Sequence, residues 1–219
     1  VAWTANQLKQ KSVVYMPKGS SLERLKNIQA ENADASITDL NYDDAVRLAN
    51  ENAKKYGWVV IQDTSWENYQ DIPRWIIQGY STMAYEAYTQ MSQKPTHIFI
   101  QAGVGSLAGA ITGFFANAYK EDKPIITVVE PETANCIFRT AKANDQKLHF
   151  VKGNMPTIMA GLACGEPCDI GWNILKKHAD FAIACADNIS AKGMRLLGAP
   201  LSGDTRIISG ESGAVTSGL

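Results

Sequence analysis

Length, composition and charge narrow the classes of protein to which this chain can belong. It has 219 residues, of which 45% are hydrophobic and 20% charged, as in an ordinary globular protein. The formal net charge of −1 provides no basic field for nucleic acid or anionic lipid, and no apolar run has the length that a bilayer requires. We therefore expect a cytoplasmic protein with no nucleic-acid partner and no membrane partner.

Short apolar runs alternate with amphipathic segments along the chain, which is typical of a parallel α/β fold. In the first third, Ser20 and Glu23 predict a capping box that begins a helix, and Asn41 and Gly57 predict the two ends of another. Strands are expected at residues 13–16, 35–38, 58–63, 97–101, 125–129, 181–185 and 206–209. The later helices are expected at residues 71–91, 133–142, 169–178 and 188–197.

A change in composition near residue 62 separates a more polar first third from a more apolar remainder, so we expect domains at residues 1–62 and 63–219. Residues 1–9 have the pattern of a helix interior without a capping residue, and residues 209–219 end abruptly. Both features lead us to expect an internal piece of a longer protein.

The most informative segment is the apolar run from His97 that leads through Gly103 and Gly105 into an apolar helix. Such a turn directs unpaired backbone N–H groups and the positive end of a helix dipole toward a bound anion, for which a phosphate fits best. Ser106 adds a hydroxyl donor. A glycine turn that serves only packing is the alternative. The turn lacks the lysine of a Walker loop and matches the dinucleotide fingerprint only loosely, without a convincing ribose-binding acid.

Polar clusters follow four of the expected strands, at residues 62–65, 103–106, 130–133 and 209–212. Ligands of open parallel sheets gather at the carboxyl ends of strands, so these clusters predict one shared site. Asp63 is a candidate acid, base or partner for a substrate ammonium, with a helix cap as the alternative. Glu130 suits capping or a supporting role better than direct contact, and Glu211 either faces the pocket or favours a helix N-terminus.

No metal site is expected, because the histidines and cysteines show no paired ligand spacing. No Ser-His-Asp arrangement is expected either, and the three histidines suit packing or surface roles.

Seven motifs in order resemble the pyridoxal-phosphate enzymes of fold type II, the tryptophan-synthase β and threonine dehydratase family. Within that family they are most similar to ammonia-lyases that act on 2,3-diaminopropionate. The motifs are VVYMPKGSS (13–21), QDTSW (62–66), QGYSTMAYE (78–86), QAGVGSLAG (101–109), VEPET (129–133), MAGLACGEP (159–167) and SGESGAV (209–215).

The resemblance implies a three-layer α/β fold with mostly parallel sheets, in which residues 1–62 are part of a small domain and residues 63–219 part of a larger, cofactor-bearing domain, both incomplete. It implies pyridoxal 5'-phosphate as cofactor and a homodimer that acts on a small amino acid. It places Asp63 on the substrate side. It assigns the cofactor phosphate to Gly103, Val104, Gly105, Ser106 and Leu107, and the surroundings of the cofactor ring to Gly210, Glu211 and Ser212.

The implied reaction is an α,β-elimination that converts 2,3-diaminopropionate to pyruvate and ammonia in the intact protein. A lyase or dehydratase for serine, threonine or cysteine is one alternative, and a non-catalytic α/β module that binds a phosphorylated metabolite is another.

The resemblance also places the family's Schiff-base lysine upstream of Val1, and no lysine of the chain lies in such a context. We therefore predict that the 219 residues alone do not turn over substrate. A pyruvate-release assay on the purified chain with added cofactor tests this expectation, and sustained turnover would contradict the placement of the lysine.

Overall fold

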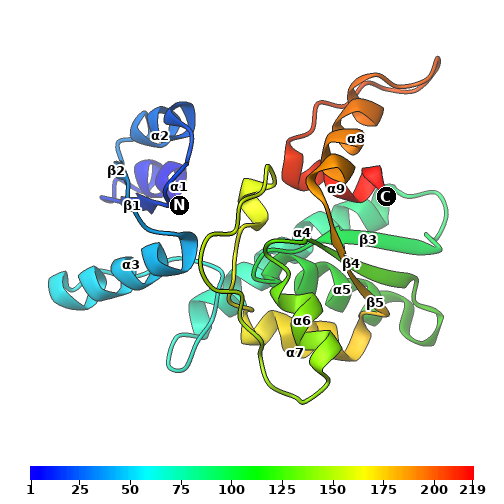
Figure 1. The fold of residues 1–219 in the computed structure, drawn as a ribbon, viewed down its shortest axis with the longest axis horizontal. Helices are drawn as coiled ribbons and strands as arrows, with labels where there is room; N and C mark the ends of the chain where they lie inside the picture. Colours follow the sequence, from blue (N-terminus) through cyan, green and yellow to red (C-terminus); the bar gives the residue numbers. More distant parts are fainter. The chain divides into compact units, whose positions relative to one another are not determined.

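The computed structural model describes residues 1–219 and divides into two compact units, Val1–Ile61 and Gln62–Leu219 (Figure 1). Each unit has a parallel sheet of its own. None of the helices has the length and apolar character needed to cross a membrane.

The first unit contains a two-stranded parallel sheet with helices before, between and after its strands. Its elements are α1 (Ala2–Gln7), β1 (Val13–Met16), α2 (Leu22–Gln29), β2 (Asp34–Ile37) and α3 (Tyr42–Tyr56). As expected, the Asn41 side chain caps α3 by accepting from the Asp44 N–H at 2.8 Å, and Gly57 ends the helix with a φ of +71°. Local side-chain chemistry therefore sets both ends of α3.

Two expectations for the first unit are wrong. Ser21 rather than Ser20 caps α2 and accepts from the Arg24 N–H at 3.1 Å, so the capping box with Glu23 does not form. Ser20 instead donates its hydroxyl to the Pro17 carbonyl at 2.7 Å. Residues 58–63 form no strand, because β1 and β2 pair only with each other and leave this apolar segment without a neighbour.

The second unit is built on a three-stranded parallel sheet in the order β3-β4-β5. Its elements are α4 (Asp71–Gln90), β3 (His97–Gln101), α5 (Ser106–Tyr119), η1 (Lys120–Asp122), β4 (Ile125–Pro131), α6 (Cys136–Ala143), η2 (Ala160–Leu162), α7 (Asp169–His178), β5 (Phe181–Cys185), α8 (Asp187–Gly198) and α9 (Glu211–Gly218). The bounds of α7 and β5 match the prediction. The strand expected at residues 206–209 is absent, since no neighbouring strand pairs with that segment, and Ile208 is 78% exposed.

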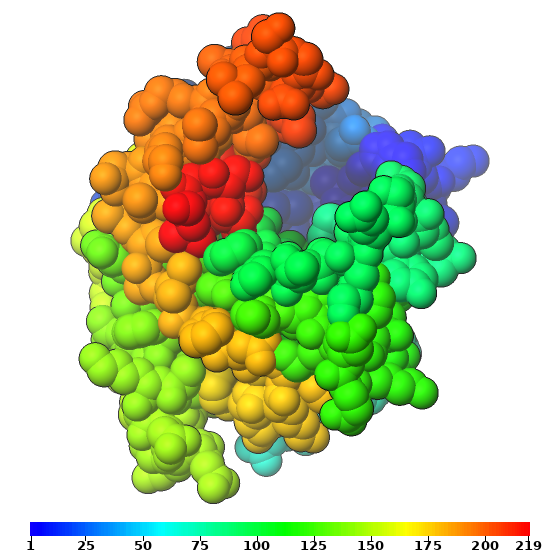
Figure 2. All heavy atoms as spheres, turned by 90° about the vertical axis from the view of Figure 1, so that its right-hand side faces the viewer, coloured from blue at the N-terminus to red at the C-terminus, as the bar shows by residue number.

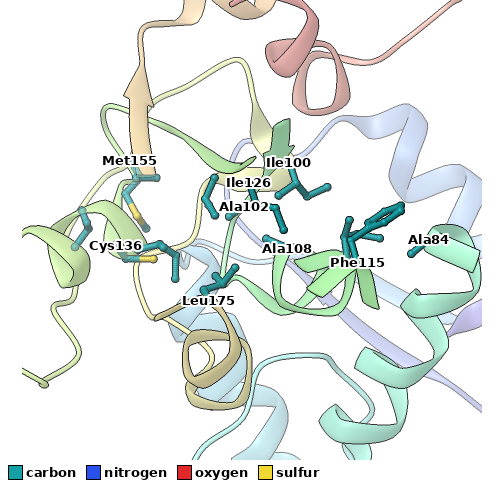
Figure 3. Packing of buried hydrophobic residues seen from close by; sticks show 14 residues of the cluster. Ala84, Ile100, Ala102, Ala108, Phe115, Ile126, Cys136, Met155 and Leu175 are labelled. Atoms are coloured by element: carbon teal, nitrogen blue, oxygen red, sulfur yellow. The ribbon is translucent and has the colours of Figure 1, made fainter. Parts of the chain in front are cut away.

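Helices cover both faces of this sheet (Figure 1). On one face, Ile100, Ile126 and Val128 pack with residues of α5, α6 and α7 in a core that Figure 3 shows from close by. On the other face, Val129 and Cys185 pack with Val215 of α9, and Figure 2 shows α9 (red) lying against α8 (orange). The expected α/β architecture with parallel sheets is confirmed.

Glycines allow α7 to approach the turn at the start of α5. A Cβ on Gly171 would lie 2.6 Å from the Gly105 carbonyl oxygen, and one on Gly109 would lie 2.9 Å from Gly171 Cα. Real Cβ atoms do not approach other atoms so closely, so both positions require glycine. This contact fixes the distance between α7 and the turn that follows β3.

Gly171→Ala is predicted to lower the free energy of unfolding by about 1–3 kcal/mol, because its methyl group forces backbone atoms of the Gly105 turn to move. Chemical denaturation of the purified protein measures the change. Gly79→Ala is the matched control, since a Cβ there meets nothing within 4 Å on helix α4. The control is expected to stabilise by about 0.5–1 kcal/mol, and equal effects of the two substitutions would contradict the packing role of Gly171.

Candidate functional site

Three successive carbonyl groups in the turn between β3 and α5 face protein donors. The Gly103 carbonyl faces the Cys136 thiol at 3.6 Å. The Val104 carbonyl accepts from the Cys168 N–H at 2.7 Å, and the Gly105 carbonyl accepts from the Gly109 N–H at 2.8 Å. The turn is therefore tied to α6, to α7 and to its own helix.

The N–H groups of the same turn face away from these donors. In a trans peptide the N–H points opposite to the carbonyl, and the chain contains no cis peptide. The N–H groups of residues 103–108 have no protein acceptor, although Val104, Gly105 and Ser106 are buried. Gly105 reaches the conformation that this requires with a φ of +94°, a region that residues with side chains rarely adopt.

Buried N–H groups without an acceptor are costly, and α5 has no side-chain cap to satisfy its first turn. An anion with several oxygens would accept from these groups and would also meet the positive end of the helix dipole. The turn therefore fits a phosphate group. The phosphate cradle at residues 103–107 stays a prediction, and this geometry is compatible with it.

The role predicted for the Ser106 side chain is wrong in one respect. Its hydroxyl does not face the open side of the turn but donates to the Asp63 carbonyl at 2.6 Å, and Ser106 is only 1% exposed. The Ser106 hydroxyl proton is thus already used, and the residue offers an anion only its backbone N–H. Its side chain instead joins the polar cluster at residues 62–65 to the start of α5.

Asp63 therefore lies beside the turn, as predicted, although residues 58–63 do not form the strand at whose end it was expected. Its Oδ2 accepts from the Tyr80 hydroxyl at 2.9 Å, whereas its Oδ1 has no partner in the protein. No lysine, arginine or histidine forms an ion pair with it. This half-buried carboxylate has room and charge for a cation from outside the chain.

The start of α9 reaches the turn through η2. The Gly161 N–H donates to Ser212 Oγ at 3.2 Å, and a Cβ on Gly103 would lie 3.3 Å from the Gly161 carbonyl oxygen. Gly161 thus lies between Gly103 of the turn and Ser212 of α9 and contacts both. The neighbouring Glu211 accepts from the Ser190 hydroxyl through its backbone carbonyl at 2.6 Å, and Gly210 is exposed at the N-cap of α9.

Glu130 caps a helix rather than facing the open turn. Its carboxyl oxygens accept from the N–H groups of Ile137 at 2.9 Å and Phe138 at 2.6 Å, at the start of α6. The side chain is fully buried, and burial raises its pKa to about 8 although the two helix N–H groups act in the opposite direction. Glu130 thus satisfies the N-terminus of α6 from within the protein.

Sequence reasoning assigned no role at the site to Tyr80, Cys136 or Cys168. Tyr80 lies within the motif of residues 78–86 and Cys168 directly follows the motif of residues 159–167, but neither motif indicates which residue its side chain contacts. They reach the site only because the fold joins segments that are distant along the chain. No group of three or more His, Cys, Asp or Glu side chains that could hold a metal ion is present.

The geometry agrees with comparisons with known proteins. A family model described as "Pyridoxal-phosphate dependent enzyme" matches residues 1–218. The chain belongs to this family. The family is named for a phosphorylated cofactor, and the assignment of its phosphate to residues 103–107 stays a prediction.

Within this family, the chain is similar to proteins named diaminopropionate ammonia-lyase. Diaminopropionate ammonia-lyase of Salmonella typhimurium is 54% identical over 224 residues, which cover 100% of this chain and 55% of the relative. The Escherichia coli K12 protein of the same name is 50% identical over 222 residues, with the same coverage of both chains. A crystal structure of the holo Escherichia coli diaminopropionate ammonia lyase superposes with a TM-score of 0.93 at 49% identity, over 100% of this chain and 55% of that one. The chain spans about half the length of the curated relatives it matches.

The buried Glu130 predicts a dependence of stability on pH. Its pKa is about 8 in the folded protein and about 4.5 without burial. Between these values the folded state keeps a proton that the unfolded state releases, so rising pH favours unfolding. Stability relative to Glu130→Gln is expected to be greatest below pH 4.5 and to fall by at most about 1.4 kcal/mol per pH unit up to pH 8.

Denaturant unfolding of both proteins between pH 4 and pH 9 measures this difference, with Glu121→Gln at an exposed turn as control. A difference that stays flat from pH 5 to pH 8 would show that Glu130 is ionised in the native state.

Proposed function

We propose that the full-length protein is a pyridoxal-phosphate-dependent ammonia-lyase that converts 2,3-diaminopropionate and water to pyruvate and two molecules of ammonia. The observation that carries the proposal is a pair of features side by side in the second unit. One is a turn whose outward N–H groups lack acceptors, and the other is Asp63, a carboxylate without a cation. The identity to diaminopropionate ammonia-lyases supports the same reaction.

The cofactor phosphate would accept from the backbone N–H groups of residues 103–107, where the positive end of the α5 dipole favours an anion. When bound, pyridoxal phosphate withdraws electrons from the substrate α-carbon, which makes the α-proton and the group on the β-carbon removable. The protein would orient the cofactor by holding its phosphate. The turn suits this role because it is tied to α6 and α7 and cannot shift without breaking those hydrogen bonds. Gly210, Glu211 and Ser212 would border the ring of the cofactor from the start of α9.

Asp63 would bind the second ammonium group of the substrate or move a proton during its departure. Its Oδ1 is the atom available for this contact, because Oδ2 is engaged by Tyr80. A carboxylate with no internal counter-ion favours a diamine over a hydroxy amino acid, since only the diamine carries a second positive charge. This charge match is our reason for preferring the diamine among the substrates of the family.

The remaining parts of the proposal follow the family resemblance. Residues 1–62 would be part of the small domain and residues 63–219 part of the larger domain that binds the cofactor phosphate. The protein would act as a homodimer in the cytoplasm.

The experiment that tests the proposal is pyruvate release by the full-length protein with pyridoxal phosphate, from 2,3-diaminopropionate, serine and threonine in parallel. We expect a value of kcat/KM for the diamine at least about tenfold above those for serine and threonine, which is about 1.4 kcal/mol of transition-state discrimination. Comparable or better turnover of the hydroxy amino acids would replace the proposal with a dehydratase. Absence of turnover on all three, with phosphate or cofactor still bound, would indicate a non-catalytic module.

A further inference from the structure

Asp63 is held at two points by neighbouring helices. Its backbone carbonyl accepts from the Ser106 hydroxyl at the start of α5, at 2.6 Å. Its Oδ2 accepts from the Tyr80 hydroxyl on α4, at 2.9 Å. Because α4 and α5 pack against each other, the two contacts fix both the position of the residue and the direction of its carboxylate.

The groups that face Asp63 leave it without a counter-charge. Two tyrosines are the titratable groups that interact with it, Tyr80 directly and Tyr69 through its charge. The Tyr69 hydroxyl lies at the neighbouring backbone, 3.1 Å from the Gln62 nitrogen. The Ser106 hydroxyl, on α5, carries no charge.

Both phenols remain protonated donors at physiological pH. Burial raises the pKa of Tyr80, and the negative charge of Asp63 raises it further. Burial also raises the pKa of Tyr69, against the hydrogen bond with Gln62. The hydroxyl of Tyr80 therefore donates to a carboxylate and cannot itself become a competing negative charge.

We propose that Tyr80 is the positioning residue for Asp63, which it holds with Oδ1 directed to the substrate ammonium. The inference rests on the proposed function and deepens it, because it names the group that orients the acid. Tyr80 contributes no proton to the reaction.

Tyr80→Phe isolates this role, because it removes the hydroxyl and keeps the ring in its place on α4. In the full-length holoenzyme, we expect kcat/KM for 2,3-diaminopropionate to fall about tenfold, the loss of one hydrogen bond to a charged group. The ratio of kcat/KM for the diamine to kcat/KM for serine should fall as well, because only the diamine carries the second ammonium group that Asp63 binds. A merely structural role of Tyr80 would lower both values alike and leave this ratio unchanged.

Two further variants make the experiment specific. Tyr85→Phe on the same helix removes a tyrosine hydroxyl that has no hydrogen-bond partner, and its ring contacts Phe114 in either form. It is expected to leave kcat/KM and the ratio between diamine and serine unchanged. In an Asp63→Asn background, Tyr80→Phe is expected to have less than about a twofold further effect, because the carboxylate it positions is gone.

A readout that does not depend on turnover is the carboxyl ¹³C chemical shift of Asp63 at neutral pH, measured by NMR in protein labelled with ¹³C-aspartate and assigned with Asp63→Asn. This chemical shift should change in Tyr80→Phe, because the carboxylate loses a hydrogen-bond donor, and should stay the same in Tyr85→Phe. An unchanged chemical shift together with an unchanged substrate ratio would overturn the proposal. If the wild type has no activity on the diamine, the proposed function fails, whereas the NMR chemical shift still decides whether Tyr80 holds Asp63.

Discussion

The candidate site depends on the way in which the protein holds the carbonyl groups of the turn after β3. Three successive carbonyls, those of Gly103, Val104 and Gly105, face donors from α6, α7 and α5. The trans geometry of each peptide then directs the following N–H to the other side. Neither the glycines nor the helix dipole alone would create this arrangement. It exists because α7 comes close enough to bond to the turn, and this approach depends on the absence of a side chain at Gly171.

The helices α5 and α6 follow neighbouring strands, and the protein treats their N-termini in opposite ways. At α6 a buried carboxyl group, Glu130, accepts from two of the first N–H groups. At α5 no side chain does so, and the equivalent groups have no acceptor. An internal carboxylate at the start of α5 would occupy the place of a phosphate and repel it. The N-terminus of α6 is therefore satisfied from within the protein, whereas the N-terminus of α5 is left open for a ligand.

Local signals in the sequence were sufficient for much of the fold and for part of the site. The cap of α3 at Asn41, the bounds of α7 and β5, and the glycine turn all depend on residues near one another in the chain. The predicted strand at residues 58–63 failed because an apolar run becomes a strand only beside a partner. The Ser106 hydroxyl donates to a residue that is 43 positions away along the chain. The Tyr80 hydroxyl donates to the same residue, Asp63, from a distance of 17 positions. Composition and periodicity do not predict contacts between residues that are so far apart in the sequence.

The hydroxyl of Ser106 connects Asp63 to the turn at the start of α5. By donating to Asp63 rather than to an anion, it makes the acid part of the same rigid arrangement as the turn. A ligand held by the N–H groups at the start of α5 and an ammonium held by Asp63 would then be positioned by one helix and its immediate contacts. Catalysis by orientation requires reacting groups to stay within a fraction of an ångström of their places. A shared support of this kind meets that requirement better than two sites on separately moving segments.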